Sequence, residues 1–157
     1  MTLALDWRWK RFDALSVREL QYILRARQEV FGLEQNCVYL DIDGCDEDAF
    51  HLAAWSDERA VPLAYARWLD PGVKYAEPSL GRVITTGTAR GTGLGRELVR
   101  RALEAGARIH PGLGVRIGAQ SRLERFYTDF GFVVVGERYI EDGIPHIEML
   151  RAADPSV

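Results

Sequence analysis

The spacing of apolar residues changes along this chain, and its period predicts which segments form strands. Two tryptophans alternate with charged residues over residues 6–10, a period of two that is typical of a half-buried strand. The apolar segments 51–55 and 61–69 flank the turn-forming residues 56–59, an order that predicts a hairpin. Further strands are predicted at residues 80–86, 115–119, 132–135 and 147–150.

Helical spacing first occurs after Ser16. Ser16 and Glu19 have the spacing of a capping box, which opens a helix, and Gly32 is expected to end that helix. Residues 94–109 and 122–130 are predicted as further helices. The apolar face of the first helix is expected to consist of Val17, Leu20, Ile23, Leu24, Val30 and Phe31.

The order of these elements and the length of the chain indicate one domain. Strands outnumber helices and the helices lie between them, so we expect an α/β fold with a mixed central sheet flanked by helices. The chain has 157 residues, of which 47% are hydrophobic and 27% charged, and it shows neither internal repeats nor a linker. We therefore expect a single domain over residues 1–157.

Composition argues against several classes of partner. The net charge of −3 does not favour a nucleic-acid ligand, and no apolar segment approaches the roughly 20 residues needed to cross a bilayer. The N-terminus lacks the apolar core and cleavage site of a signal peptide. Cys37 and Cys45 are therefore expected to be free thiols of a cytoplasmic protein, and they lack the partners of a zinc site.

The acidic segment 41–48, with the sequence DIDGCDED, has some resemblance to a calcium-binding loop. Its glycine falls at the fourth position instead of the sixth, and the twelfth position carries no glutamate, so the EF-hand interpretation fails. We expect a solvated acidic loop and no metal.

The strongest chemical signal is the glycine-rich segment Arg90-Gly-Thr-Gly-Leu-Gly-Arg96, which follows a predicted strand and opens a predicted helix. Glycines allow close approach of a ligand to the backbone, and a helix N-terminus attracts an anion such as a pyrophosphate. Neither the P-loop nor the Rossmann spacing is met. Phosphate binding and a purely structural turn both remain open from spacing alone.

These residues resemble a known family when they are taken with a second motif. Arg90-x-x-Gly93-x-Gly95 resembles the acetyl-CoA signature of the GNAT superfamily of N-acetyltransferases, and residues 119–132, with Tyr127 inside them, resemble its second motif. More narrowly, the chain resembles the ElaA-like group. The matching segments are Val30-Phe31, Glu34-Gln35, Cys37-x-Tyr39, Asp43-Gly44, His51-Leu52, Gly81-Arg82-Val83 and Tyr139-x-Glu141-Asp142-Gly-Ile-Pro-His146.

The sequence departs from that group at two places. Val38 stands where the group has proline, and Thr86-Gly87 stands where it has Ser-Pro. Neither position belongs to the ligand-binding glycines, so the departures concern local loop shape.

The resemblance implies how acetyl-CoA would bind. Two central strands would be splayed to admit it, and the backbone of Val83, Ile84 and Thr85 would pair with its pantetheine arm. Its pyrophosphate would lie on the segment that follows. The residues implied there are Arg90, Gly91, Thr92, Gly93, Leu94, Gly95 and Arg96.

The resemblance also implies direct transfer of the acetyl group to an amine, with Tyr127 beside the CoA sulfur. A backbone N–H would stabilise the tetrahedral oxyanion, and the phenol would protonate the departing thiolate. A structural role in the core is the alternative for Tyr127. The acceptor is expected to be a small-molecule or peptide amine, and the sequence leaves a homodimer open.

An ammonium must lose a proton before it attacks, so a base or an anionic site is expected near the acceptor. Glu34 and His146 are the candidates we favour, since histidine titrates near neutral pH; Glu77, Glu141 and Asp142 are further candidates. A structural or solvated role is the alternative for each. A non-catalytic acyl-CoA-binding module, a structural interaction domain and a nucleotide-dependent oxidoreductase are the competing functions.

Overall fold

The first four strands form one antiparallel sheet in the computed structural model, which describes residues 4–154. Their order is β1-β2-β3-β4, and the predicted strands are confirmed with small shifts at their ends. The central strands of this sheet are buried almost throughout, as expected from their nearly continuous apolar sequence. The bounds are β1 Asp6–Arg11, β2 Ala49–Trp55, β3 Ala64–Leu69 and β4 Ser79–Thr85.

The remaining strands form a second antiparallel sheet in the order β5-β8-β6, with β7 paired to the other end of β8. Sequence reasoning missed β7, although Asp142-Gly143 is a typical hairpin turn and both residues have positive φ. The bounds are β5 Val115–Gln120, β6 Phe132–Val134, β7 Tyr139–Glu141 and β8 Ile144–Arg151.

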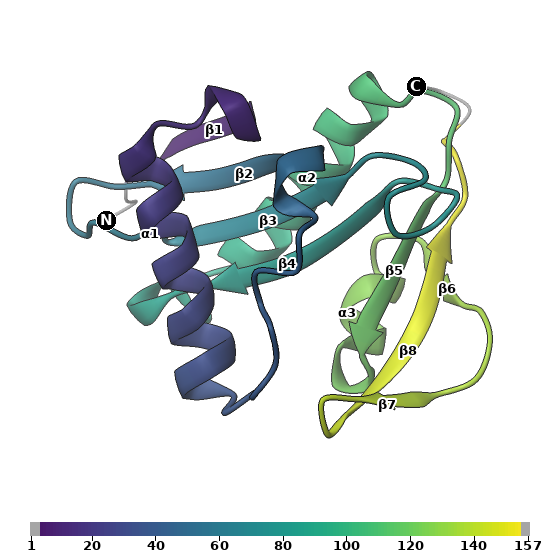
Figure 1. The fold of residues 1–157 in the computed structure, drawn as a ribbon. Helices are drawn as coiled ribbons and strands as arrows, with labels where there is room; N and C mark the ends of the chain where they lie inside the picture. The colour runs from purple at the N-terminus through teal and green to yellow at the C-terminus, as the bar shows by residue number, and fades with distance from the viewer. Residues whose placement is uncertain (1–3, 155–157) are drawn as a thin grey trace.

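The two sheets meet at β4 and β5, which start close together and then diverge (Figure 1). The backbone N–H of Arg116 donates to the carbonyl of Pro78 at 3.0 Å near the start of both strands. The expected α/β fold with two splayed central strands is therefore confirmed. The expectation of a mixed sheet needs a refinement, because every strand pair within the two ladders of residues 4–154 is antiparallel.

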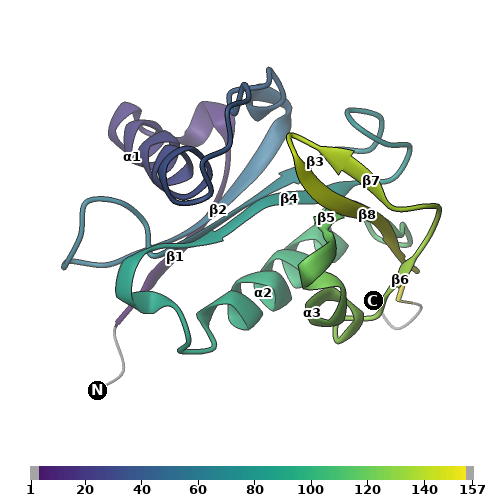
Figure 2. The same cartoon turned by 90° about the horizontal axis from the view of Figure 1, so that it is seen from below.

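Helices cover both faces of the first sheet. Helix α1 (Val17–Arg27) lies on one face and α2 (Leu94–Ile109) on the other, whereas α3 (Glu124–Thr128) lies beside α2 and packs against β6 of the second sheet (Figure 2). The predicted capping box of α1 and the predicted bounds of α2 are confirmed. Four short 3₁₀ turns complete the fold: η1 Phe12–Ala14, η3 Asp46–Asp48, η4 Gly87–Ala89 and η5 Ser121–Leu123.

The first helix does not end at Gly32, contrary to the sequence prediction. It continues as a π-helical segment, η2 (Gln28–Glu34), and the residue beyond it with a left-handed φ of 52° is Asn36. Val17 was also misplaced on the apolar face, since 89% of its surface is exposed. π-helical turns occur often at functional sites, and this one carries the chain to one side of the cleft described below.

The core divides between the two faces of β3. Trp68 faces α2, where Leu98 and Ala102 are completely buried, and a Cβ added to Gly106 would meet the Trp68 ring at 2.2 Å. Tyr65 faces the other way, in the cluster that includes Ile23 of α1. Packing on both sides holds β3 and its neighbour β4 in place, and β4 forms one wall of the candidate site.

Candidate active site

A cleft of about 380 Å³ opens where β4 and β5 diverge. Val83 of β4 lines one side, Ile117 of β5 lines the other, and Tyr127 of α3 lies in its wall. His146 of β8 also lines the cleft, so the structure brings this residue and Tyr127 to the same cavity. Glu34 does not line it.

A bulge in β4 shapes the cleft wall. Ile84 pairs with Tyr65 and Gly81 with Arg67, so Arg82 and Val83 together stand opposite the single residue between those two partners. A bulge of this kind leaves one residue outside the hydrogen-bonded ladder. Arg82 has a φ of +50°, a strained value for a residue with a side chain.

Side-chain contacts of Arg82 explain how this backbone strain is held. Its guanidinium pairs with Asp41 at 2.8 Å and with Asp43 at 3.2 Å. It also lies over the rings of Tyr39 and Phe31, at 5.5 and 6.0 Å from their centroids. Four side chains of the 31–43 segment therefore hold Arg82 of β4 at one position of the cleft wall.

The acidic segment 41–48 is not the solvated loop that the sequence predicted. Asp46 is 6% exposed and accepts hydrogen bonds from Arg27 at 2.7 Å and from Arg67 at 3.0 Å. Asp43 accepts two bonds from Arg67, at 2.8 and 2.9 Å. Both arginines are almost completely buried, so the prediction failed because the partners of these carboxylates lie far away in the sequence.

This ion network is charged at neutral pH. Burial opposes ionisation of Asp46, but hydrogen bonds and attraction from Arg27 and Arg67 outweigh it and lower the pKa of Asp46. The pKa of Asp43 is lowered by the same balance of burial against Arg67 and Arg82. Each carboxylate is therefore an anion that neutralises a buried cation, and the network ties the segment to β3 and β4.

The glycine-rich segment forms an open anion-binding turn before α2. Gly91 and Gly93 have φ values of 78° and 83°, and the position of a Cβ on either glycine has open space around it. Gly93 caps α2 without a side-chain hydrogen bond to the first turn, which leaves the helix N-terminus available for an anion. Thr92 instead donates its hydroxyl to the carbonyl of Ala89, within the turn.

The two arginines that flank this turn are already paired. Arg90 donates two hydrogen bonds to the carbonyl of Thr85 and pairs with Glu34 at 2.5 Å. Arg96 pairs with Asp129 at 3.1 Å. The structure thus places Glu34 beside the glycine-rich turn, where its carboxylate faces Arg90.

Tyr127 is buried against the other aromatic residues of its motif. It is 6% exposed, and its ring meets Phe126 and Phe132 edge-on at 5.1 and 5.8 Å. Burial raises the pKa of Tyr127 well above its usual value, and the nearby Arg122 only partly opposes this. The phenol therefore stays protonated and can act as a proton donor in the cleft.

His146 of β8 lines the same cleft, and its two ring nitrogens have different partners. Its Nδ1 lies 2.7 Å from the carbonyl of Ile144, and because a carbonyl can only accept, Nδ1 carries the hydrogen. In the neutral ring Nε2 is then unprotonated, and it lies 3.7 Å from a carboxylate oxygen of Glu141. The ring stacks on Tyr139 at 5.6 Å, which fixes its orientation.

The other candidate bases divide into two kinds. Glu141 and Asp142 both line the cleft at the β7–β8 turn. Glu77 instead forms an ion pair with Arg116 at 2.9 Å and is absent from the cleft lining. Of these three candidates, the two at the turn are therefore the ones that line the cleft.

Sequence reasoning missed a bridge across the cleft. Gln120, at the end of β5, donates from Nε2 to Oε1 of Gln35 at 3.0 Å, and its own Oε1 accepts from Arg122 at 3.0 Å. The two glutamines are 85 positions apart, so no local pattern could have paired them. The bridge joins the end of η2 to β5 above the gap between the sheets.

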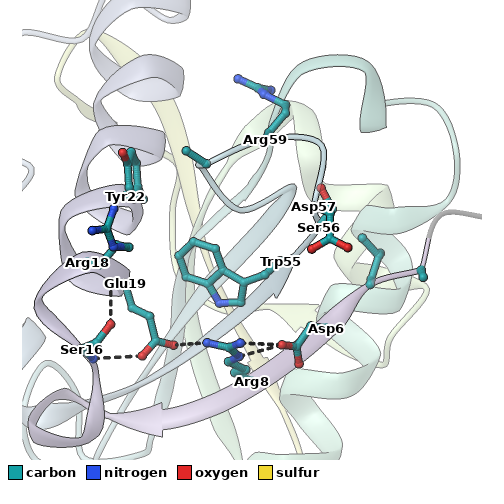
Figure 3. Close-up of a pocket in the computed structure, with 13 residues that line it drawn as sticks. Asp6, Arg8, Ser16, Arg18, Glu19, Tyr22, Trp55, Ser56, Asp57 and Arg59 are labelled. Atoms are coloured by element: carbon teal, nitrogen blue, oxygen red, sulfur yellow. Dashed lines mark hydrogen bonds and ion pairs between the residues drawn. The ribbon is translucent and has the colours of Figure 1, made fainter.

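A separate hollow of about 580 Å³ lies between the start of α1, β1 and the β2–β3 loop (Figure 3). Glu19 binds Arg8, Lys10 and the backbone N–H of Ser16 there. Burial opposes its ionisation, but these bonds lower the pKa of Glu19 to about 2. The hollow contains neither the glycine-rich turn nor Tyr127, and its charged groups hold α1 on the sheet.

Comparison with known proteins identifies the class to which this cleft belongs. Residues 22–152 match the family described as acetyltransferase (GNAT) domains. The chain belongs to this family, and the resemblance to it and to the ElaA-like group is confirmed. Among residues 4–154, no helix is long and apolar enough to span a membrane, and no three His, Cys, Asp or Glu side chains are grouped to hold a metal ion.

Individual relatives cover nearly the whole chain. Protein ElaA of Escherichia coli is 41% identical over 94% of this chain and 96% of its own length. A UPF0039 protein of Synechocystis sp. is 40% identical over 98% and 99%. A crystal structure of an acyl-CoA N-acyltransferase from Pseudomonas aeruginosa superposes with a TM-score of 0.90 and 44% identity, over 95% of this chain and all of that one. The fold is thus that of acyl-CoA N-acyltransferases.

Proposed function

We propose that this protein is an N-acetyltransferase that moves an acetyl group from acetyl-CoA directly to an amine. The observation that carries the proposal is the geometry of one cleft. Splayed strands with a bulge and a buried, protonated Tyr127 line one cavity, and β4 leads from this cavity to the open glycine turn at the start of α2.

The cofactor would bind along residues that follow one another in the chain. The backbone of Val83, Ile84 and Thr85 would pair with the pantetheine arm, because no strand of the described residues is hydrogen-bonded to β4 on its β5 side beyond its start. The pyrophosphate would lie on the amides of residues 91–96, with the positive end of the α2 dipole beneath it. Arg90 and Arg96 would then exchange their carboxylate partners for phosphate oxygens or hold both.

The transfer has two chemical events. The amine nitrogen attacks the carbonyl carbon of the thioester, and a backbone N–H at the Arg82–Val83 bulge stabilises the oxyanion. The carbon–sulfur bond then breaks, and the thiolate takes the Tyr127 proton. The products are the acetylated amine and the free CoA thiol.

Residues of the β7–β8 hairpin would remove the proton from the amine. Glu141 and Asp142 attract the ammonium, and Nε2 of His146 accepts its proton because Nδ1 is already committed to the Ile144 carbonyl. A catalytic role for Glu34 remains a prediction. Its pairing with Arg90 gives it a second role, the control of charge beside the pyrophosphate turn.

A free-thiol assay tests the proposal. The protein is incubated with acetyl-CoA and a panel of amines, amino acids, peptides and aminoglycosides, and the acetylated product is identified by mass spectrometry. We expect thiol release that depends on one amine class. Binding of acetyl-CoA without thiol release from any amine would instead identify a non-catalytic acyl-CoA-binding module.

A further inference from the structure

The segment that follows η2 carries an unusual row of exposed apolar side chains. Val38, Leu40 and Ile42 are 95%, 76% and 56% exposed, whereas Cys37, Tyr39 and Asp41, which alternate with them, are partly buried. This alternation is the pattern of a strand with one face buried. Here the outward face is the apolar one, which is the reverse of a solvated strand.

The backbone of this segment is also unpaired. Between η2 and η3 the chain runs as a coil outside both sheets (Figure 1). Within residues 4–154, the backbone N–H and C=O groups of Val38, Tyr39 and Leu40 form no hydrogen bond. Unpaired backbone with outward apolar side chains is what a sheet edge offers to an added strand.

Contacts at both ends hold the segment in place. The N–H of Cys37 donates to the carbonyl of Phe31 at 2.9 Å. At the other end, the carbonyl of Asp41 accepts from Arg27 at 2.9 Å, and its carboxylate pairs with Arg82 at 2.8 Å. Tyr39 packs inward against Phe31 at 6.4 Å. The segment is thus anchored, and ordering it costs a ligand little.

The exposed apolar side chains of Val38, Leu40 and Ile42 lie beside the candidate active site. A second hollow, of about 740 Å³, lies along the segment and includes Val38 and Ile42 in its lining. It shares part of its wall with the cleft, so a ligand that leaves the cleft on this side enters the second hollow. The shared residues are Phe31, Cys37, Tyr39 and Leu40.

We infer that the acceptor is the amine of an extended peptide with apolar side chains, which pairs with residues 37–42 as an added strand. This rests on the proposed acetyl transfer. A small amine would fill the cleft and leave the apolar row and its backbone uncovered. A second copy of the chain on the row would obstruct the shared wall through which an acceptor enters. Glu141 and Asp142, across the cleft, suit the cationic amine at the end of such a peptide.

Binding is tested first, with a heptapeptide of alternating valine and serine that has a free amino terminus and a fluorescent label at its C-terminus. Its affinity for the CoA-loaded protein is measured by anisotropy. Val38→Asp is expected to weaken it about tenfold, the effect of losing one buried valine contact. Val17→Asp is the matched control, since Val17 is 89% exposed on α1, and it leaves the affinity unchanged. Affinity for CoA stays the same in both variants.

A peptide with N-methyl groups on alternate backbone nitrogens tests strand pairing, and it should bind about tenfold less tightly because its donors are blocked. The inference is overturned if the methylated peptide binds as tightly as the unmethylated one. It is also overturned if the peptide binds Val38→Asp as tightly as it binds the wild type. A dimer that Val38→Asp dissociates while peptide binding is unchanged overturns it as well, because a second copy then covers the row.

Thiol release separates this inference from the proposed function. If small amines react while peptides neither bind nor react, the peptide acceptor is overturned and the proposed acetyl transfer is retained. If peptides bind at residues 37–42 but no amine causes release of the CoA thiol, acetyl transfer is overturned and the peptide site is retained.

Discussion

The two sides of the cleft are built from different kinds of contact. On the proposed cofactor side, β4, the glycine turn and the start of α2 follow one another over residues 83–96, and the turn and the helix start are shaped by their own local sequence. On the proposed acceptor side, residues from the segments 33–42 and 139–146 line one cleft, and the first segment is held by partners elsewhere in the chain, such as Gln120 and Arg27. A ligand common to many enzymes can be bound by a local motif, whereas a particular acceptor is recognised by a surface assembled from distant segments.

The largest expected effect tests the cofactor side. Gly93→Glu places a carboxylate, in a strained conformation, where the pyrophosphate is proposed to bind. We expect the dissociation constant of acetyl-CoA, measured by calorimetry, to rise at least about 100-fold, since charge-assisted hydrogen bonds to phosphate are lost. Gly112→Glu is the control, because Gly112 has a similar φ of 76° and equally open surroundings on another loop. Equal weakening by both variants would show that strain alone is responsible.

The next largest effect tests the chemical step. Tyr127→Phe removes one hydroxyl, which accepts and donates no hydrogen bond among the described residues, and keeps the ring packing. We expect kcat to fall about 100-fold, the range of general acid catalysis, while acetyl-CoA affinity is unchanged. Tyr22→Phe serves as the matched control, because Tyr22 of α1 lines the separate hollow and not the cleft. A normal kcat in Tyr127→Phe, with chemistry shown to limit the rate, would contradict the assignment.

What could be predicted from sequence follows the same division. The glycine spacing predicted the turn at residues 91–95, and the helical period of apolar residues predicted the bounds of α2. Local signals also existed for features that were missed: Asp142-Gly143 marks the β7–β8 hairpin, although it was not used. The splay of β4 from β5 rested on family resemblance, and no residue pattern within either strand encodes it.

The remaining errors have a common physical cause. The acidic segment was predicted to be solvated because its carboxylates are charged. Arg27 on α1 and Arg67 on β3 make the burial of Asp46 favourable. Gly32 was expected to stop the helix, but it does not adopt a left-handed φ; the helix continues to Glu34, and the N–H of Cys37 in the following segment donates to the carbonyl of Phe31. Ion pairs and packing between distant segments override local preference, and a single sequence does not show which distant residues will meet.

A smaller effect separates two residues on the acceptor side. His146→Ala removes the proposed proton acceptor, so we expect kcat/KM to fall about tenfold at neutral pH. Acetyl-CoA affinity, measured by calorimetry, should be unchanged, because His146 is proposed to act on the acceptor amine. Glu34→Gln should cause a smaller change in kcat/KM, since its carboxylate faces Arg90. Wild-type kcat/KM in both variants would assign both residues to the scaffold.

The smallest effect concerns the two cysteines, one of which lies at the boundary between the two sides. Cys37 lines the cleft, yet both Cys37 and Cys45 are free thiols whose pKa is raised, chiefly by burial and further by nearby carboxylates. A raised pKa leaves little thiolate, which is the nucleophilic form. Direct transfer needs no acyl-cysteine, so the double change of Cys37 and Cys45 to Ser should leave kcat/KM within a few-fold. A trapped acetyl-cysteine in the wild type, or lost turnover in a folded double variant, would replace direct transfer with a two-step mechanism in which the cleft holds its own nucleophile.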